Sequence, residues 1–68
     1  MQKIKVADIV ACSQSTFSEA IKSAVEDAQR TYGRLEGVEI APPWNVLITK
    51  DNKVEFRTTV RVHYRSED

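Results

Sequence analysis

The chain has 68 residues and is poor in the residue types that cross-link small domains or stiffen their turns, with one cysteine, two glycines and two prolines. Its single cysteine, Cys12, cannot close an internal disulfide, so we expect a reducing, cytoplasmic location. No leader-like apolar stretch follows the first five residues. No apolar run approaches the roughly 18 residues that a bilayer span requires, so we expect no membrane association.

An excess of charge is missing too, because ten Lys and Arg residues are balanced by ten Asp and Glu residues. Most nucleic-acid-binding domains are basic, so we expect no nucleic-acid partner. The sequence also lacks a Ser-His-Asp order, a glycine-rich phosphate loop and clustered Cys/His metal spacing. It therefore offers no catalytic set, and we expect that the protein is not an enzyme.

The small size of the chain limits how well one copy can bury its own apolar residues. A chain of 68 residues lies near the lower limit for folding alone without disulfides or metal. A compact protein of this mass has a folded surface of about 4,300 Å². We expect one domain over residues 1–68, and we expect self-association to supply further buried surface.

Hydrophobic periodicity predicts a strand over residues 3–11 and then an amphipathic helix. Thr16 and Glu19 fit a capping box, with Ser13 and Ser15 as alternative caps. Gly33 supplies the positive φ that ends a helix at low cost. The apolar stripe of the helix consists of Phe17, Ala20, Ile21, Ala24, Val25, Ala28 and Tyr32.

Two further strands follow the predicted helix. The first begins at Val38, is forced to bulge, bend or run along an edge by Pro42 and Pro43, and resumes over residues 44–49. Residues 50–53 predict a tight turn. Strict alternation then predicts a strand over residues 54–65 with one apolar and one polar face. The sequence thus predicts an α+β fold, a single β-α-β-β unit whose three-stranded, mainly antiparallel sheet packs on one amphipathic helix.

The order of these elements, the chain length and two short phrases together resemble the dodecin family. Residues 9–17, Ile-Val-Ala-Cys-Ser-Gln-Ser-Thr-Phe, are similar to the opening strand and helix cap of that family. Residues 51–57, Asp-Asn-Lys-Val-Glu-Phe-Arg, are similar to its hairpin. The resemblance covers nearly the whole chain. It implies a hollow homododecamer with cubic symmetry, which agrees with the self-association expected from chain size.

The resemblance also identifies candidate cofactor positions. In flavin-binding dodecins a tryptophan at the start of the second strand stacks on the flavin, and a glutamine in the third strand hydrogen-bonds its polar edge. The matching positions here are Gly37 and Arg57. Glycine offers no ring, and arginine cannot accept a hydrogen bond, so flavin is disfavoured as a cofactor. Trp44 is the one shifted aromatic that could replace the ring, although we favour a core or subunit-contact role for it.

Calcium is the other ligand that the resemblance leaves open. The step Phe56-Arg57 is similar to a dodecin subgroup without the flavin pair, one member of which binds calcium. The candidate carboxylates are Asp8, Glu36, Glu39, Asp51, Glu55, Glu67 and Asp68. They show no EF-hand spacing, so a calcium site would have to converge across subunits, and the metal ligands stay unassigned.

Three other features have both a functional and a structural interpretation. His63 could bind metal or sense pH, but we favour a solvated or interface residue. Arg57, Arg61 and Arg65 share one side of their strand and could clamp an anion, but we favour ion pairs between subunits with Glu36 or Glu39. Cys12 precedes a helix, yet no base lies near it in sequence, so we favour an inert thiol.

These observations favour a self-assembling, dodecin-like shell that binds or stores a small ligand or ion. The alternatives are a purely structural shell without a ligand, a flavin-binding dodecin that uses Trp44 and, least favoured, a small subunit of an enzyme assembly.

Overall fold

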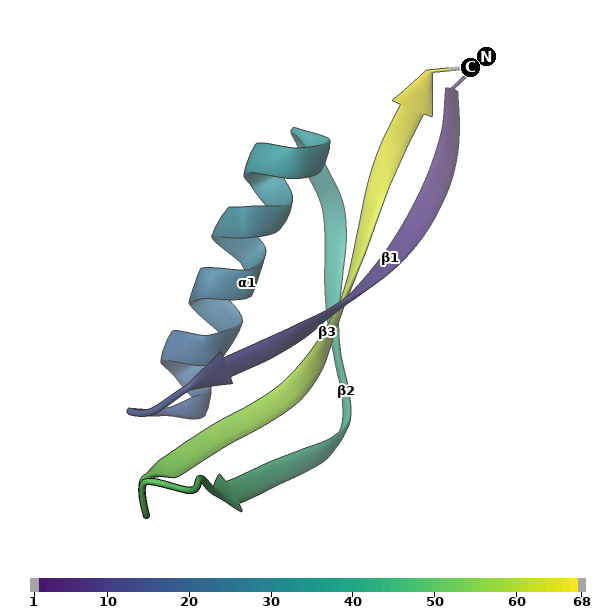
Figure 1. Cartoon of the computed structure of the whole chain (residues 1–68). Coiled ribbons are helices and arrows are strands. Elements are labelled where there is room, and N and C mark those ends of the chain that lie inside the picture. Colours follow the sequence, from purple (N-terminus) through teal and green to yellow (C-terminus); the bar gives the residue numbers. More distant parts are fainter. Residues whose placement is uncertain (1, 68) are drawn as a thin grey trace.

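The computed structural model describes residues 2–67 and contains three strands and one helix (Figure 1). They are β1 (Gln2–Ser13), α1 (Phe17–Tyr32), β2 (Leu35–Ile48) and β3 (Val54–Glu67). The strand order is β1-β3-β2, and β3 pairs antiparallel with both neighbours. The predicted β-α-β-β, α+β fold is confirmed.

Local hydrogen bonds define both ends of α1. The Thr16 hydroxyl accepts a hydrogen bond from the Glu19 amide at 3.0 Å, which decides between the three predicted caps in favour of Thr16. Ser13 and Ser15 instead hydrogen-bond to each other. At the other end Gly33 has a φ of 78°, and its amide donates to the Gln29 carbonyl.

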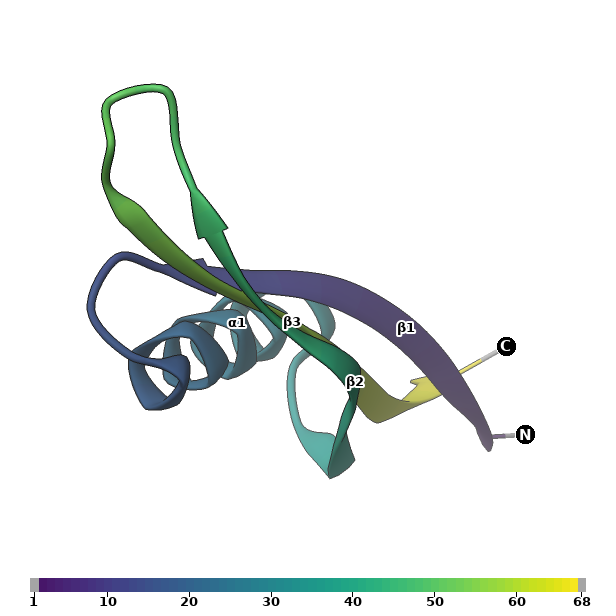
Figure 2. The same ribbon diagram turned by 90° about the horizontal axis from the view of Figure 1, so that it is seen from below.

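The core lies between α1 and the middle of the sheet, and the helix covers one face only (Figure 2). On β3 the alternation prediction is confirmed, because Thr58, Val60 and Val62 are all buried. The facing residues are small, namely Ala11 of β1 with Ala20, Ala24 and Ala28 of α1. Small side chains let the helix lie close to the sheet, so β3 is tightly covered where the helix crosses it.

Strand β2 contains two irregularities that change its pairing with β3. The first lies between Leu35 and Gly37 and leaves Glu36 as an extra residue. Strand β2 also begins at Leu35, three residues before the predicted Val38. The second lies between Ala41 and Asn45, where the sequence predicted a bulge or bend; the Pro42–Pro43 peptide there is cis. The buried hydroxyl of Thr58 donates to the Ala41 carbonyl at 3.1 Å at this point.

The subunit is elongated because its strands are longer than its helix. A helix of 16 residues measures about 24 Å, whereas a strand of 14 residues measures about 46 Å. The molecule measures 49 × 21 × 18 Å. Residues 45–55, which we call the hairpin end, extend away from α1 (Figure 2). Within residues 2–67, no helix is long and apolar enough to cross a membrane.

Candidate functional site

The face of the sheet turned away from α1, which we call the outer face, carries most of the candidate functional residues. Alternation along β3 places Arg57, Arg61, His63 and Arg65 on it. The register adds residues from both edge strands, namely Ile4, Val6, Asp8, Val10 and Cys12 of β1 and Gly37, Glu39, Ala41, Asn45 and Leu47 of β2.

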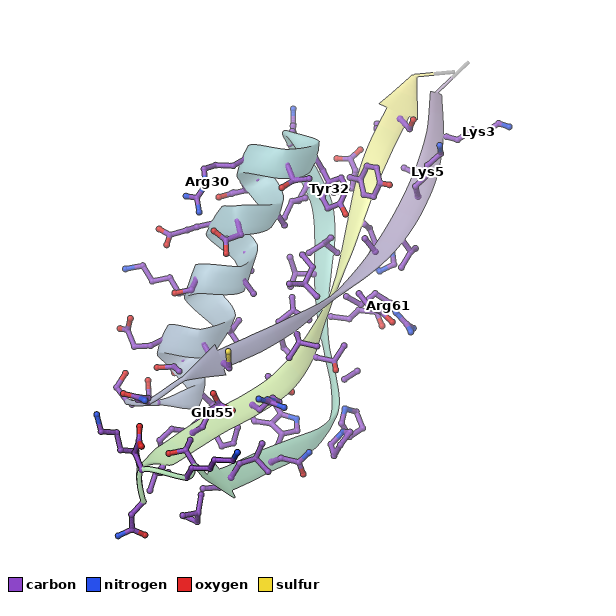
Figure 3. All side chains as sticks on the ribbon, in the orientation of Figure 1. Lys3, Lys5, Arg30, Tyr32, Glu55 and Arg61 are labelled. Carbon is purple, nitrogen blue, oxygen red and sulfur yellow. The ribbon has the colours of Figure 1, made fainter. Side chains whose placement is uncertain are left out.

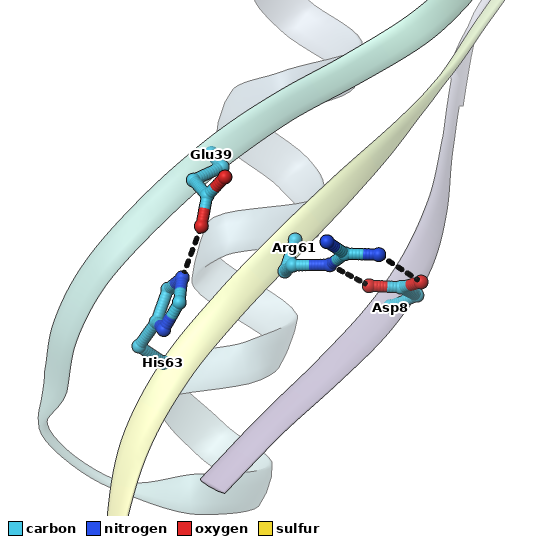
Figure 4. Close-up of polar contacts among 4 residues, drawn as sticks. All are labelled: Asp8, Glu39, Arg61 and His63. Atoms are coloured by element: carbon cyan, nitrogen blue, oxygen red, sulfur yellow. Dashed lines mark hydrogen bonds and ion pairs between the residues drawn. The ribbon is translucent and has the colours of Figure 1, made fainter. Parts of the chain in front are cut away.

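A bidentate ion pair joins β1 to β3 at the centre of the outer face (Figure 4). Nε of Arg61 donates to Asp8 Oδ1 at 2.8 Å, and Nη2 donates to Oδ2 at 3.3 Å. The hydrogen bond from Arg61 and its positive charge hold the pKa of Asp8 below its ordinary value, and the hydrogen bond to Asp8 and its negative charge raise the pKa of Arg61. Asp8 is an unusual residue for a strand, and Arg61 directly opposite explains its presence.

A second polar pair lies on the β2 side of the same face. Nε2 of His63 lies 2.5 Å from Oε1 of Glu39 (Figure 4). Gly37 stands opposite His63 in the register, and a Cβ added to Gly37 would meet only the imidazole Cδ2, at 3.8 Å. The glycine therefore leaves the imidazole open on that side.

Two more ion pairs involve the other two arginines of the outer face. Arg65 hydrogen-bonds to Glu36, the extra residue of the first β2 irregularity, and Arg57 hydrogen-bonds to Glu55 at 2.6 Å. Glu36 is thus a partner of Arg65 as expected, within one chain, while the pairing between subunits stays a prediction. Strand pairing brings Glu36 of β2 to Arg65 of β3, whereas Glu55 and Arg57 stand two residues apart on β3 and so share its outer face. Arg61 projects from the side of the sheet opposite α1 (Figure 3).

The three predicted cofactor residues do not come together within one subunit. Gly37 and Arg57 share the outer face, but Gly37 lies opposite His63, six residues or about 20 Å along β3 from Arg57. Trp44 lies against the start of α1, with its ring 5.0 Å from that of Phe17 in an edge contact, and remains half exposed. A single binding pocket formed by all three residues would need more than one copy.

The candidate metal ligands and the thiol of Cys12 also do not come together in one site. Of the predicted calcium carboxylates, those of Asp8, Glu36, Glu39 and Glu55 each contact a cationic side chain or the imidazole. No group of three metal-ligating side chains occurs in the part of the chain that the structure describes. Asp68 and the side chain of Glu67 lie outside the described residues. Cys12 is exposed and pairs in register with Arg57, far along the sheet from His63.

A recess that sequence reasoning missed lies at the C-terminal end of α1. It has a volume of about 480 Å³ and is lined by Tyr32, Arg34, Glu36 and Arg65. The ring of Tyr32 stacks on Tyr64 at 4.2 Å and an interplanar angle of 19°. Both tyrosines lie on the predicted apolar faces, but their stacking depends on how the helix end meets β3, which a residue pattern does not reveal.

A sequence profile of known families agrees with this geometry, because the dodecin profile matches residues 4–67. The chain belongs to the dodecin family. The match spans nearly all of the residues that form the sheet and helix of this dodecin fold. A search of curated protein sequences finds no match to this chain.

Solved dodecin structures share the fold over the whole chain. An arginine-to-alanine variant of the Thermus thermophilus dodecin has a TM-score of 0.82 at 22% identity, with 100% of both chains covered. The dodecin from Streptomyces davaonensis has a TM-score of 0.82 at 21% identity, with 98% of this chain and 97% of its own chain covered. The calcium dodecin from Mycobacterium tuberculosis, which is called calcium chelating, has a TM-score of 0.85 at 18% identity, with 96% and 91% covered.

Proposed function

We propose that this chain forms a dodecin-like homododecameric shell that binds or stores a small ligand or an ion without transforming it. The observation that carries the proposal is the amount of surface that one subunit leaves exposed. Its accessible area is 4860 Å². A compact protein of this mass would expose about 4,300 Å². The subunit therefore has roughly 500 Å² more surface than a globular monomer, and identical neighbours can cover it.

The character of the exposed surface supports the same proposal. The radius of gyration is 13.6 Å, against about 11 Å for a compact domain of this length. Many large apolar side chains are exposed, namely Ile4, Val6, Val10, Val38, Trp44, Val46, Leu47, Ile48 and Val54. Apolar residues in such number on one small subunit are typical of a protein that assembles.

Binding is better supported than catalysis by the chemistry of the outer face. The one thiol, on Cys12, and the one imidazole, on His63, stand about 20 Å apart along the sheet, too far for a nucleophile and its base. Four candidate carboxylates, those of Asp8, Glu36, Glu39 and Glu55, contact a cationic side chain or the imidazole, which does not favour calcium within one subunit. A calcium site would have to combine carboxylates from several copies.

The native mass of the purified protein tests both parts of the proposal. We expect twelve subunit masses, with an added mass when a ligand is retained. Repeating the measurement with calcium and with a chelator shows whether the ion is calcium. A monomer at low micromolar concentration would overturn the shell, and a dodecamer that retains no ligand or ion under any condition would favour the purely structural alternative.

The missing flavin pair can be tested by restoring it. The double variant Gly37→Trp/Arg57→Gln should gain flavin binding, seen as quenched flavin fluorescence, because the space beside Gly37 accepts a side chain. Each stacking contact contributes about 0.5–1.5 kcal/mol, or roughly a 2- to 13-fold change in affinity. The control is Gly37→Ala/Arg57→Gln, which supplies no ring.

The flavin alternative based on Trp44 predicts a different result. In that case the unmodified protein binds flavin, and Trp44→Phe weakens the binding. If the unmodified protein binds no flavin, this alternative is excluded.

A further inference from the structure

We propose that the recess at the C-terminal end of α1 binds a small organic anion, whose carboxylate or phosphate group is held by Arg34 and Tyr32. The inference deepens the proposed function, on which it rests for the expectation that the protein holds a small ligand, by naming a place and a chemical class. All the residues that line the recess belong to one chain, so the site is complete before any assembly.

The walls of the recess come from four parts of the subunit. Tyr32 is the last residue of α1 and lies where the helix end meets β3 (Figure 3). Arg34 follows in the connection to β2, Glu36 stands in the first irregularity of β2, and Arg65 lies on β3. The volume of about 480 Å³ lies within the range of roughly 300–1,000 Å³ that small-molecule sites occupy. The recess is therefore large enough for a small organic molecule.

One wall of the recess is fixed by aromatic stacking. The ring of Tyr32 lies against the ring of Tyr64, with the two centroids 4.2 Å apart. A side chain that is already held in place loses little freedom when a ligand binds. The hydroxyl of Tyr32 forms no hydrogen bond to any other residue in the described part of the chain. The ring is thus anchored, while its polar end is available to a ligand.

The charged residues of the recess leave one cation unbalanced. Glu36 accepts a hydrogen bond from Arg65, so these two charges compensate each other. Arg34 is exposed, and among residues 2–67 it has no hydrogen-bond or ion-pair partner. The residues that line the recess therefore carry an excess of one positive charge.

The end of α1 reduces this excess without removing it. A helix C-terminus carries a partial negative charge of about half an elementary charge, and here one of its carbonyls is already bound by the Gly33 amide. Within the described residues, no carboxylate except that of Glu36 lines the recess. A bound cation would have to compete with Arg65 for Glu36, whereas a bound anion meets Arg34 directly.

The available donors determine the class of ligand. A guanidinium group donates hydrogen bonds but accepts none, and its planar fork fits two oxygens of a carboxylate or phosphate. The Tyr32 hydroxyl can donate to the same group, and its ring offers an apolar surface to the rest of the ligand. The recess therefore suits a molecule with one oxyanion group and a small apolar body.

Ligand-observed NMR of the purified protein with three matched probes tests this site. Benzoate carries a carboxylate, phenyl phosphate carries a phosphate, and benzyl alcohol has the same ring without a charge. We expect one or both anions to bind, and the neutral probe to bind about tenfold more weakly or less, because a charge-assisted hydrogen bond is lost. The tighter-binding anion identifies the charged group. Equal binding of all three probes would overturn the inference.

Single substitutions identify the residues that hold the anion. Arg34→Gln should weaken anion binding about tenfold or more, because it removes the charged donor. Tyr32→Phe keeps the ring and removes the hydroxyl, so it should weaken binding about 2- to 10-fold. The matched control is Arg30→Gln, because Arg30 pairs with Asp27 and does not line the recess. The control should leave the affinity unchanged.

Glu36→Gln tests the charge argument in the opposite direction. This variant removes a negative charge from the lining, together with the charge that Arg65 contacts. Both benzoate and phenyl phosphate should then bind more tightly than to the unmodified protein. Unchanged or weaker binding in Glu36→Gln would contradict an anion site.

The outcomes separate this site from the proposed function. The native mass tests the shell, whereas the probes test a site within one chain. If the protein assembles but binds neither anion, or if Arg34→Gln binds as well as the unmodified protein, the anion site alone is overturned. If Arg34→Gln instead lowers the native mass, Arg34 serves a contact between copies and the inference also fails. A monomer that binds the anions keeps the site and overturns the shell.

Discussion

The middle of the sheet and the hairpin end have the same residue pattern but opposite environments. Along β3 the alternation of apolar and polar residues runs through both, yet Val60 is fully buried and Val54 is 40% exposed. The difference is the length of α1, which covers only the middle of the strands. Alternation therefore identifies the side chains that gain by burial, while the reach of a neighbouring element decides whether one copy can bury them.

The largest expected effect on the free energy of unfolding comes from truncating one valine to alanine in each of the two regions. Val60→Ala should lower the free energy of unfolding by about 2 to 3 kcal/mol, because it leaves a cavity under α1. Val54→Ala should lower it by less than about 0.5 kcal/mol in the separated subunit, since solvent already reaches the side chain.

Urea unfolding at a series of protein concentrations measures both effects. The loss in Val60→Ala should be the same at every concentration, whereas the loss in Val54→Ala should shrink as dilution separates the copies. A loss in Val54→Ala that stays the same at every concentration would show that neighbouring copies do not cover the hairpin end.

An intermediate effect is expected where the covered middle meets the irregular part of β2. Thr58→Val removes the hydroxyl that donates to the Ala41 carbonyl and should lower the free energy of unfolding by about 1 to 2 kcal/mol. The matched control is Thr59→Val, one residue along the strand on the outer face, which should change it by less than about 0.5 kcal/mol. The same urea titration compares the two, and a control as damaging as Thr58→Val would contradict the role of the hydrogen bond.

The smallest effect is expected on the outer face, where the polar pairs are exposed. Because the hydrogen bond and charge of Arg61 lower the folded-state pKa of Asp8, the pair stabilises the fold above the unfolded value of 3.8. This contribution disappears as the pH falls through the lowered pKa. Asp8→Asn lacks it, so the unmodified protein should be the more stable at neutral pH.

Thermal unfolding of the unmodified protein and of Asp8→Asn between about pH 5 and pH 2 measures the loss of this contribution. The difference in stability between the unmodified protein and Asp8→Asn should shrink as the pH falls. Asp51→Asn in the hairpin turn is the control, and we expect it to show no comparable trend. A difference that stays constant with pH would indicate that Asp8 acts through something other than its charge.

Much of the fold followed from local patterns. The apolar stripe of α1, the cap at Thr16, the turn at residues 50–53 and the alternation on β3 depend on neighbours in sequence, and the structure confirms them. The disturbance of β2 at Pro42 and Pro43 was also predictable, because proline cannot donate in a ladder. The irregularity at Glu36 was not, since no proline or glycine stands at that residue.

The candidate site was less predictable because its contacts join distant segments. Asp8 is an unusual residue for a strand, but its pairing with Arg61 requires the register of residues 53 positions apart. Gly37 and Arg57 were selected through family resemblance, and their separation along one sheet face emerged only when the strands were paired. Trp44 could not be assigned to either side of the sheet, because the proline irregularity interrupts the alternation that normally gives the direction of a side chain.

The sequence by itself determined the elements and their order, because helix caps, apolar periodicity and proline geometry act over a few residues. Only the tertiary structure decided which charges meet on the outer face, and that the sheet continues beyond its helix. Both depend on strand register and relative length, which arise when segments far apart in the chain pack together. For the same reason the apolar hairpin end became visible as an uncovered surface only in the folded subunit.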